Sequence, residues 1–475
     1  MTEPGSNSSS NKRKIALIIA IFLVSRAMTA AFGIHLEYGA LFKYWQYLDV
    51  ETLKHHLLLG IWYDHAQPPC FNILLALVLR IGGNNAPFLF AGILHLISLA
   101  NTLLLFSILS RLIRNSFIPL LLALLYLLSP GLLIFESELF YTTFISLLLL
   151  LSTHAILRLR TDHRWVTVAG VFIPLVIACL TRSMYHLLWL AAIAGTLLLL
   201  LKKDPAFTRL AVASVLSLLV TAGWYIKNYI VFGEFSTSSW IGMNLARTVF
   251  HDHPAKDSSR IEAYEPFSDI NTYKPFIHTD AAARYAGLDD RDLLQAYKND
   301  SFLNENNINY IDLSHQYMTA SKAYVRAHPI DYLKNVGQSA IMFFAPATRY
   351  PFAEVQAKKI SYYDLLYSFN LSQLVTGKEP RKIALALSAL PKCLIYSWVF
   401  FIILRSANRQ NMPSPLNAFI LLTILFSFGV SSFIEHYENM RFRFEVEPLF
   451  LVLLGQALST TPFFKTKGSP KHSFK

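Results

Sequence analysis

Long apolar runs alternate with short polar stretches along most of this chain. An α-helix needs about 20 mainly apolar residues to cross the hydrocarbon core of a bilayer. The runs are continuous and rich in Leu, so the pattern predicts a series of membrane helices. The apolar runs cover 14–34, 67–82, 86–110, 116–133, 138–157, 165–181, 184–201, 207–232, 384–404, 414–434 and 443–461.

One long polar segment, 233–335, interrupts the runs and predicts a soluble loop with short helices. Within the first polar loop, the stretches "LFKYWQYL" and "ETLKHHLLLGIW" place apolar and aromatic residues at helical spacing. They predict short amphipathic helices lying in the membrane interface. The expected divisions are a cytoplasmic tail (1–13), an N-terminal transmembrane catalytic module (14–232) with outer loop 35–66, an extracytoplasmic loop region (233–335), a C-terminal transmembrane module (336–461) and a basic cytoplasmic tail (462–475).

Composition supports a membrane protein and argues against a nucleic-acid partner. The 475 residues are 54% hydrophobic and only 15% charged, below the roughly 25% charged residues of soluble domains. The net charge of +12 comes from short basic clusters between apolar runs, without a basic stripe that would suit nucleic acid. The three cysteines lie far apart in apolar runs, which favours packing roles over disulfides or a metal site.

The basic clusters predict the topology, because Lys and Arg accumulate in cytoplasmic loops. All clusters lie inside if the run 67–82, which is only 16 residues long and opens with Pro68 and Pro69, does not fully cross the bilayer. This gives ten crossings with both termini inside, within a range of about 10–12 spans. The alternative is that 67–82 crosses and the cluster at 111–114 lies outside. The clusters are 11–14, 111–114, 158–164, 202–203, 405–409 and the C-terminal tail.

This topology brings the charged and aromatic junctions of the chain to the outer face. Glu37, Glu136 and Glu138 are acids at two of these junctions. One acid can serve as general base toward an acceptor hydroxyl, while a second positions the acceptor or helps to hold a divalent cation. A solvated helix end is the simpler interpretation of Glu136.

Four cations occur at three junctions of the same face. Arg forms bidentate contacts to phosphate oxygens, and cations beside carboxylates at a membrane surface suit a phosphorylated lipid. The alternative is that each cation only anchors its helix among headgroups. The candidate phosphate-binding residues are Arg182, Lys227, Arg441 and Arg443.

Four segments, in order, resemble C-type (GT-C) membrane glycosyltransferases, and specifically the family 39 group of protein O-mannosyltransferases and lipid A aminoarabinose transferases. "HAQPPCFNILLALVLRIGG" is similar to the His-Pro-Pro helix of that group, and "LTRSMY" to its Leu-Thr-Lys/Arg step. "GWYIKNYIVFGEFSTSSWIGMNL" resembles its Pro-Trp-x-x-Arg-Asn-Tyr segment, and "RFRFEVEPLFLVL" its Arg-Tyr-Arg closing span. Gly223 and Glu445 replace family prolines, which indicates a divergent subgroup.

The resemblance implies an inverting transfer of a sugar from a polyprenyl-phosphate donor to an acceptor hydroxyl on the outer face. The family acid precedes the Pro-Pro step by about 28–30 residues, and Glu37 precedes His65 by 28 residues. Glu138 follows Glu37 by 101 residues, as the second family acid does. On this basis Glu37 is the expected base, Asp49 the alternative base and Glu138 the positioning acid.

The string "YDHAQPP" at 63–69 places ionisable residues at the start of an apolar run. The two prolines stiffen the start of a helix, where missing amide donors cost nothing. They are expected to fix His65 and Gln67 at the membrane surface, beside the acid and the lipid phosphate. A histidine that only caps the helix is the simpler alternative. Asp64 and Asn228 complete the candidate residues.

Three other functions fit parts of the pattern. A lipid-linked saccharide transporter or flippase would carry ionisable residues at mid-span and related halves, which the runs lack. A polymerase or ligase would use a polyprenyl-diphosphate donor instead. A catalytically inactive scaffold fits the missing Asp. The expected location is a bacterial inner membrane, with a lipid, glycan or protein acceptor.

Overall fold

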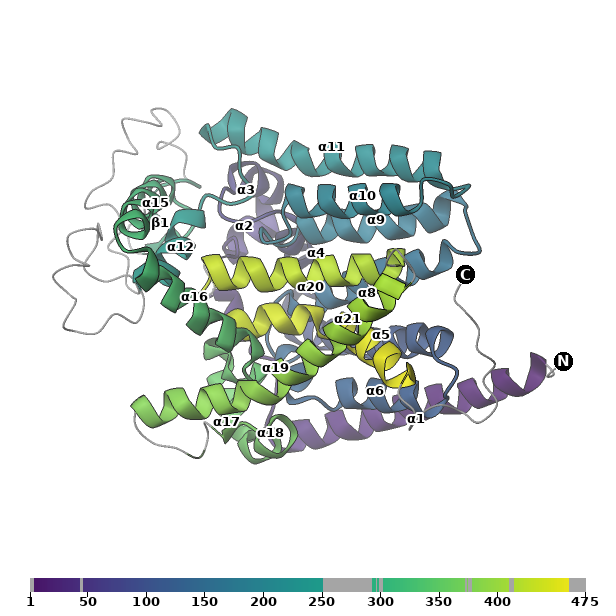
Figure 1. Cartoon of the computed structure of the whole chain (residues 1–475). Helices are drawn as coiled ribbons and strands as arrows, with labels where there is room; N and C mark the ends of the chain where they lie inside the picture. Colours follow the sequence, from purple (N-terminus) through teal and green to yellow (C-terminus); the bar gives the residue numbers. More distant parts are fainter. Residues whose placement is uncertain are drawn as a thin grey trace.

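The protein is a bundle of α-helices, seen from the side in the computed structural model of Figure 1. In the described part of the chain, the only strands are β1 (Tyr297–Lys298) and β2 (Phe302–Leu303), which pair antiparallel. The structure describes residues 4–42, 46–250, 293–295, 297–298, 302–371, 374, 378–409 and 414–460.

The N-terminal half begins with a long helix and continues through a short-helix region into a run of bundle helices. Its elements are α1 (Pro4–Ala31), η1 (Tyr38–Phe42), α2 (Val50–His55), α3 (Leu57–Tyr63), α4 (Cys70–Gly82), η2 (Gly83–Asn85), α5 (Ala86–Leu112), α6 (Phe117–Leu127), α7 (Pro130–Phe135), α8 (Thr142–Arg158), α9 (Trp165–Cys179), α10 (Leu187–Leu200) and α11 (Phe207–Phe232).

The C-terminal half crosses one end of the bundle before it returns through it. Its helices are α12 (Ile241–Phe250), α15 (Asn309–Ala327), α16 (Pro329–Phe344), η4 (Ala347–Arg349), η5 (Pro351–Ala353), α17 (Glu354–Lys359), α18 (Ser361–Ser368), α19 (Lys378–Arg409), α20 (Pro415–Ile434) and α21 (Asn439–Thr460). Helix α16 starts at Pro329, so the expected domain boundary after 335 falls inside a helix and not in a linker.

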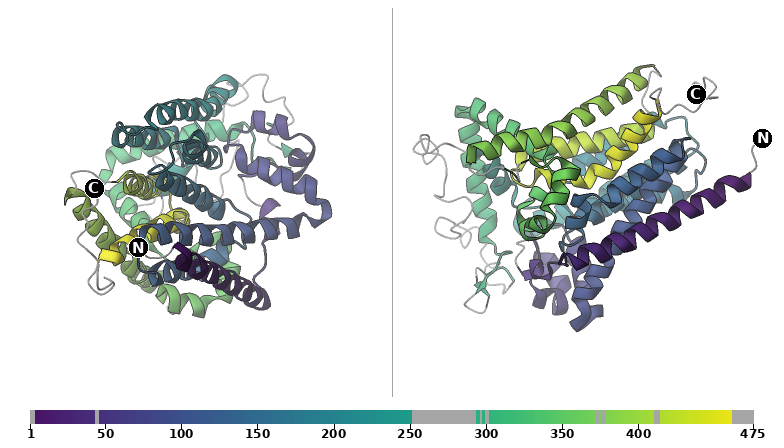
Figure 2. Two further views of the ribbon diagram at one scale, coloured as in Figure 1. Left: turned by 90° about the vertical axis from the view of Figure 1, so that its right-hand side faces the viewer. Right: turned by 90° about the horizontal axis from the view of Figure 1, so that it is seen from below.

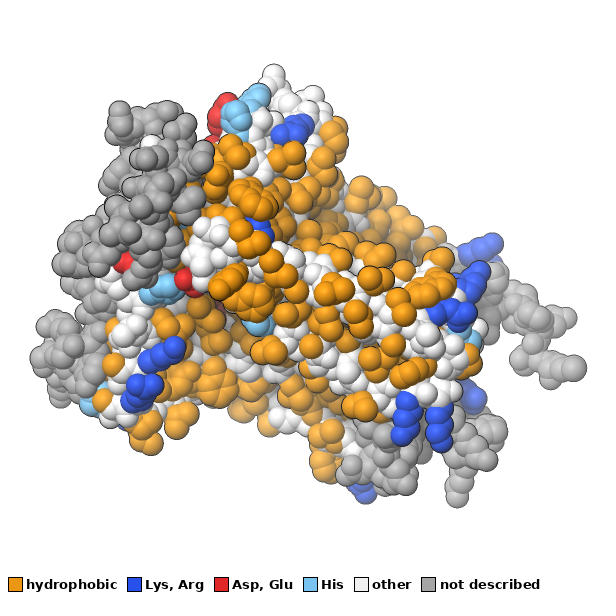
Figure 3. Space-filling view, turned by 90° about the horizontal axis from the view of Figure 1, so that it is seen from above, with side chains coloured by type: hydrophobic (Ala, Val, Ile, Leu, Met, Phe, Trp, Pro, Cys, Tyr) orange, Lys and Arg blue, Asp and Glu red, His pale blue; other side chains and the backbone are white. Residues whose placement is uncertain are grey.

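The all-α polytopic membrane class predicted from the sequence is confirmed. Within the described residues, five helical stretches are long and apolar enough to cross a membrane, and four shorter apolar helices accompany them. The long stretches are Ser10–Ala31, Cys70–Leu112, Phe207–Phe232, Lys382–Ser406 and Pro415–Ile434. On the face seen in Figure 3, exposed apolar side chains form a broad surface between the two ends of the bundle, drawn in orange.

The basic linkers gather at one end of the bundle, as the topology prediction requires. Lys14, in the first basic cluster, donates a hydrogen bond at 3.0 Å to the carbonyl of Ser116, just after the second cluster. Arg209, at the start of α11, donates at 3.0 Å to the carbonyl of His163 in the third cluster. Lys and Arg side chains cover this end in Figure 3, and α1 begins and α21 ends there in Figure 1. We call the opposite end, where α2, α3, α12 and α15 lie, the cavity end.

Helix α4, the short apolar run in question, starts and finishes at the cavity end. Its first residue, Cys70, donates its backbone N–H to the Leu180 carbonyl just after α9, at 2.7 Å. Its last residue leads into α5, where Phe90 packs on Tyr38 just after α1, with ring centroids 6.1 Å apart. This placement agrees with the expectation that 67–82 does not traverse the bundle.

Of the short helices expected in the first polar loop, the one over "ETLKHHLLLGIW" is present as α2 and α3. The stretch "LFKYWQYL" differs from the expectation, because η1 ends at Phe42, residues 43–45 lie outside the described part, and 46–48 are not helical. Leu58 and Leu59 of α3 are exposed, as expected for side chains that meet the membrane interface. The right-hand view of Figure 2 shows α2 and α3 beside the end of α1. The loop and the α12–α16 segment therefore cover the same end of the bundle.

Candidate functional site

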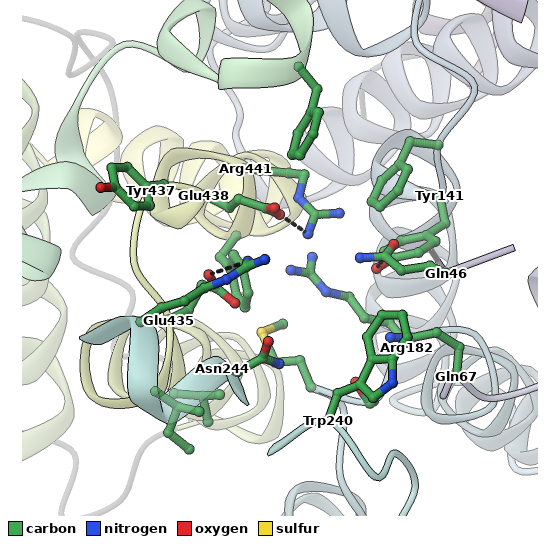
Figure 4. A pocket seen from close by; sticks show the side chains of 18 of the residues that line it. Gln46, Gln67, Tyr141, Arg182, Trp240, Asn244, Glu435, Tyr437, Glu438 and Arg441 are labelled. Atoms are coloured by element: carbon green, nitrogen blue, oxygen red, sulfur yellow. Dashed lines mark hydrogen bonds and ion pairs between the residues drawn. The ribbon is translucent and has the colours of Figure 1, made fainter. Parts of the chain in front are cut away.

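A cavity of about 540 Å³ opens at the cavity end, between the last turn of α20, the start of α21, helix α12 and the turn joining α9 to α10. Figure 4 shows Arg182 and Arg441 pointing toward each other near its middle. Amide and aromatic side chains make up much of the remaining wall. They include Gln46, Gln67, Tyr141, Trp240, Asn244 and Tyr437.

Arg182 lies in the turn after α9 and is buried. Its Nη1 forms an ion pair with Glu445 of α21, and the Tyr185 hydroxyl donates to the other oxygen of Glu445 at 3.2 Å. The guanidinium carbon lies 3.8 Å from the centre of the Phe442 ring, a cation–π contact. Nη2 has no hydrogen-bond acceptor among the described residues. Arg182 is therefore held in place with a donor still available.

Arg441 enters the cavity from the first turn of α21 and is also buried. Its Nη2 pairs with Glu438, three residues earlier. The guanidinium carbon lies 4.3 Å from the centre of the Phe140 ring. Nε and Nη1 have no acceptor within the described part of the chain. Arg441 thus repeats the pattern of Arg182, with one side of the guanidinium paired and one side available.

The two guanidinium groups act on each other electrostatically. Burial, and then the nearby charge of Arg441, lower the pKa of Arg182 to about 10, which leaves it charged at neutral pH. Buried N–H donors without acceptors cost free energy, and charged donors cost the most. An anion placed between the two arginines would satisfy these donors and offset the repulsion. The predicted meeting of Arg182 and Arg441 is therefore present in the structure.

Sequence reasoning missed two acids of this cavity, Glu435 and Glu438, which both line it. Glu435 follows the last residue of α20, and its Oε1 accepts the His436 backbone N–H at 3.1 Å. The same oxygen lies 3.7 Å from Nη1 of Arg247 on α12. Both acids stand in "EHYENMRFRFE", beside the arginines that the sequence singled out. Their closeness to those cations is the signal that could have identified them.

Gln67 is the part of "YDHAQPP" that reaches the cavity. It lines the wall, and its Oε1 has no donor among the described residues. The rest of the string is structural. The Asp64 carboxylate accepts the backbone N–H groups of Ala66 and Gln67 at 3.0 and 3.1 Å, and an N–H of Asn72 at 3.1 Å. Asp64 therefore fixes the turn that leads into α4.

His65 does not line the cavity, and it connects its own segment to two others. Its Nδ1 lies 2.7 Å from the Ser239 hydroxyl, and its Nε2 lies 3.2 Å from the Asn307 carbonyl. Burial, and then the charge of Lys227, lower its pKa to about 3. His65 is thus neutral at physiological pH, where Nε2–H donates to the carbonyl and Nδ1 accepts from the hydroxyl. This arrangement supports the simpler interpretation of a structural histidine.

Lys227 and Asn228, in the last turns of α11, also stabilise the local fold. Lys227 Nζ donates to the Asp64 carbonyl at 2.5 Å and lies 3.7 Å from the centre of a Trp224 ring. Asn228 donates to the Ser236 carbonyl at 2.8 Å and so fixes the turn after Gly233, whose φ of 74° favours glycine. Neither residue lines the cavity.

Arg443 lines a second, smaller cavity of about 120 Å³ between α6, α18, α19 and α21. It pairs with Glu447 on the next turn of α21. Lys392 of α19 lines the same space. The structure therefore separates Arg443 from Arg182 and Arg441, although only one residue stands between Arg441 and Arg443 in the sequence.

Glu37 and Glu138, the acids paired by spacing, do lie side by side. Their backbones form a parallel bridge, and the Glu37 N–H donates to the Ser137 carbonyl at 2.8 Å. Glu138 is buried, and Glu37 is partly exposed. Neither lines the 540 Å³ cavity. The spacing thus identified a real contact between two segments, next to the cavity wall that Phe140 and Tyr141 form.

Glu136 and Asp49 have structural partners. Both oxygens of Glu136 bind Arg26 of α1, at 2.7 and 2.8 Å, so the acid anchors the first helix and is not a solvated helix end. Asp49 caps α2 by accepting the Thr52 N–H at 3.0 Å. No group of three or more potential metal ligands occurs in the described residues, and the "HDH" at 251–253 lies outside them.

Comparison with known proteins gives one match. No family model and no curated protein matches the chain. Among solved structures, it is similar to the crystal structure of ArnT from Cupriavidus metallidurans bound to undecaprenyl phosphate. The two share 13% identity over 93% of this chain and 77% of that chain, with a TM-score of 0.36. A TM-score of this size does not establish a common fold, so we derive the function from the residues of this chain.

Proposed function

We propose that this integral membrane protein is an inverting glycosyltransferase. It moves a sugar from a polyprenyl-phosphate donor to an acceptor hydroxyl at the outer face of the membrane. The donor phosphate lies between Arg182 and Arg441, and the sugar occupies the space toward Gln46 and Gln67. The basic linkers at the other end of the bundle support a cytoplasmic location for that end, and hence an outer location for the cavity.

The observation that carries this proposal is the set of unused charged donors in the cavity. Arg182 Nη2 and Arg441 Nε and Nη1 are buried and lack acceptors among the described residues. A phosphate group supplies several oxygens in a small volume, and guanidinium–phosphate contacts are charge-assisted. The cavity volume of about 540 Å³ is within the range of small-molecule sites. The cavity is therefore large enough for a sugar phosphate.

The same arrangement suits the chemistry of transfer. As the bond between the sugar and the phosphate breaks, negative charge grows on the leaving phosphate. Guanidinium groups already held by Glu445 and Glu438 stabilise that charge without having to reorganise. The apolar surface of the helices offers the lipid tail of the donor an environment like the bilayer.

The predicted contributions of Lys227 and Arg443 to phosphate binding do not form part of this proposal. Lys227 is engaged with Asp64, and Arg443 lies in the second cavity. The amide side chains of Gln46, Gln67 and Asn244 offer both donors and acceptors to sugar hydroxyls. A divalent cation is not required by the proposal, since the arginines provide the positive charge.

The test uses protein reconstituted in lipid vesicles with a panel of radiolabelled polyprenyl-phosphate sugars and one polyprenyl-diphosphate saccharide. We expect one monophosphate donor to lose its label, and Arg182→Gln and Arg441→Gln to abolish that loss. Arg160→Gln, an exposed arginine at the other end of the bundle, is the matched control and keeps full activity. Turnover of the diphosphate donor alone would assign the protein to the polymerase or ligase class instead.

A further inference from the structure

We propose that Glu435 is the general base of the reaction, and that it takes the proton from the acceptor hydroxyl. This inference rests on the proposed function and deepens it. Glu435 lines the same cavity as the two arginines, on the side formed by α12 and the end of α20. Figure 4 shows it across the two guanidinium groups from Gln46, so an acceptor beside Glu435 would face the donor sugar.

The carboxylate of Glu435 has an oxygen to spare. Oε1 receives both of its contacts, the His436 N–H at 3.1 Å and the looser approach of Arg247 at 3.7 Å. Oε2 has no partner among the described residues. A general base needs such an oxygen within hydrogen-bond reach of the proton that it removes. Glu435 is buried, so the approach to it is through the cavity.

Glu438, the other acid of the cavity wall, is less suited to this role. Its carboxylate is paired directly with Nη2 of Arg441 and holds that guanidinium in place. Taking up a proton would release Arg441 at the moment when the leaving phosphate needs it. We therefore assign Glu438 to holding Arg441 in position.

Glu37, the base expected from spacing, lies outside the cavity lining together with Glu138. A base must come within about 3 Å of the acceptor oxygen or act through one water. Glu435 already lines the space that the acceptor would occupy. The two candidates differ in position, so substitution separates them experimentally.

The environment of Glu435 also adjusts its basicity. The pKa of Glu435 is raised to about 7 as the net result of three effects. Burial raises it most, the charge of Arg247 lowers it, and the nearby Glu438 raises it. A base is most effective when its pKa lies near the working pH. At neutral pH, Glu435 is ionised in a large share of molecules and still strong enough to accept a proton.

The step balances as a single displacement. The acceptor O–H proton moves to Oε2 of Glu435, while the acceptor oxygen forms a bond to the anomeric carbon. The bond between that carbon and the phosphate oxygen breaks, and its electron pair stays on the phosphate, held by Arg182 and Arg441. The proton on Glu435 then returns to water.

Azide separates the role of a base from every other role, because this anion attacks the sugar without having to lose a proton. Vesicles with the labelled donor are supplied with hydroxyl acceptors, namely water and a crude membrane-lipid extract, or with sodium azide. We expect Glu435→Gln to lower transfer to hydroxyls by about 100-fold or more. We expect the same variant to form glycosyl azide at a rate close to that of the unchanged protein.

Two further variants serve as references. Glu51→Gln changes a side chain that is 76% exposed and should leave both reactions unchanged. Glu37→Gln tests the rival base. The assignment of Glu435 is wrong if Glu37→Gln loses transfer to hydroxyls but still forms glycosyl azide, while Glu435→Gln transfers to hydroxyls normally. If Glu435→Gln loses both reactions, Glu435 supports the fold or donor binding and is not the base.

Different experimental results would overturn this inference and the proposed function. Wild-type protein that consumes none of the donors, with hydroxyl acceptors or with azide, would overturn the glycosyltransferase itself. Wild-type protein that consumes a donor establishes the enzyme, and the variants then decide the base.

The pH profile provides a second readout. The charged and titratable groups around Glu435 in the described structure are Arg247 on α12, Arg441 on α21, and His436, Tyr437 and Glu438 in the turn between α20 and α21. Protonated Glu435 accepts no proton, so transfer to hydroxyls should rise with pH up to about 7 and then level. Azide transfer by Glu435→Gln should lack this rise, and a rise of equal size would contradict the assignment.

Discussion

Two buried arginine sites in this protein differ in how much of each guanidinium is used. Arg26, in the first membrane helix, binds both oxygens of Glu136 and donates to the Leu127 carbonyl at 2.9 Å. Arg182 and Arg441 each bind one carboxylate and face a cavity with donors left over. The first site is occupied by the protein itself, and the second is ready for an anion.

The difference distinguishes structural from functional charge better than burial does. Arg26, Arg182 and Arg441 are all buried, and each has a carboxylate partner. The same distinction applies to the string at 63–69. Asp64 and His65 satisfy backbone and side-chain groups of the protein, while Gln67 presents an unpaired oxygen to the cavity. Substitutions at Arg182, Arg441 and Gln67 should therefore affect activity. Substitutions at Arg26, Asp64 and His65 should affect stability.

The largest effect is expected for Arg441→Gln. The variant loses two donors to the phosphate and leaves Glu438 without its partner. Removing a single donor to developing charge typically costs about 100- to 1,000-fold in rate, so we expect a loss of about 1,000-fold or more. Donor turnover in vesicles measures it, with Arg160→Gln as the control. Activity within a few-fold of the unchanged protein would remove the cavity from the mechanism.

A loss of stability without a loss of activity is expected for Glu136→Gln. The variant keeps one acceptor for Arg26 but leaves its charge uncompensated in an apolar bundle, which should cost about 3 kcal/mol of unfolding free energy. Thermal unfolding in detergent measures the loss, and turnover per folded molecule should not change. A stable variant with reduced turnover would instead place Glu136 in the reaction.

A smaller effect is expected for Gly242→Ala, in α12 next to the lining residues Met243 and Asn244. A Cβ at this position of α12 would lie 1.8 Å from the Ser314 carbonyl oxygen of α15, so α12 must move. Overpacking of this kind costs about 1–3 kcal/mol. It should also displace Met243 and Asn244 from the cavity and weaken donor turnover. Gly195→Ala, with open space around its Cβ, is the matched control and should lower neither stability nor turnover.

The smallest effect is expected for Asp49→Ala. The variant removes the cap of α2 and should cost about 1 kcal/mol in stability. Turnover should remain, because Asp49 binds Thr52 and does not line the cavity. A complete loss of transfer to hydroxyls, with glycosyl azide formation retained, would instead identify Asp49 as the base.

The apolar pattern predicted much of the fold, because membrane helices satisfy their own backbone groups and need little else from the sequence. The basic clusters correctly predicted which linkers gather at one end. Glu37 and Glu138 lie side by side through a backbone bridge, and the catalytic roles expected for them from their spacing stay predictions. The domain division stays a prediction, and its boundary after 335 falls within α16, which Pro329 starts.

The site was less predictable. Arg441 and Arg443 are two residues apart, and a helix turns about 200° over two residues, so both could not reach one cavity. The sequence alone is therefore enough to separate these two side chains. It is not enough to predict the engagement of Lys227 with the Asp64 carbonyl, because that contact depends on how the first loop folds over α11. Glu435 needed the structure as well, since its role depends on an oxygen left unpaired.

The most direct test of the phosphate site is the binding of radiolabelled polyprenyl phosphate to the reconstituted protein and to three single variants. We expect Arg182→Gln and Arg441→Gln to lose binding, while Arg443→Gln, in the second cavity, keeps it. Binding that survives in both cavity variants and disappears in Arg443→Gln would contradict a phosphate site between Arg182 and Arg441 and move it to the smaller cavity.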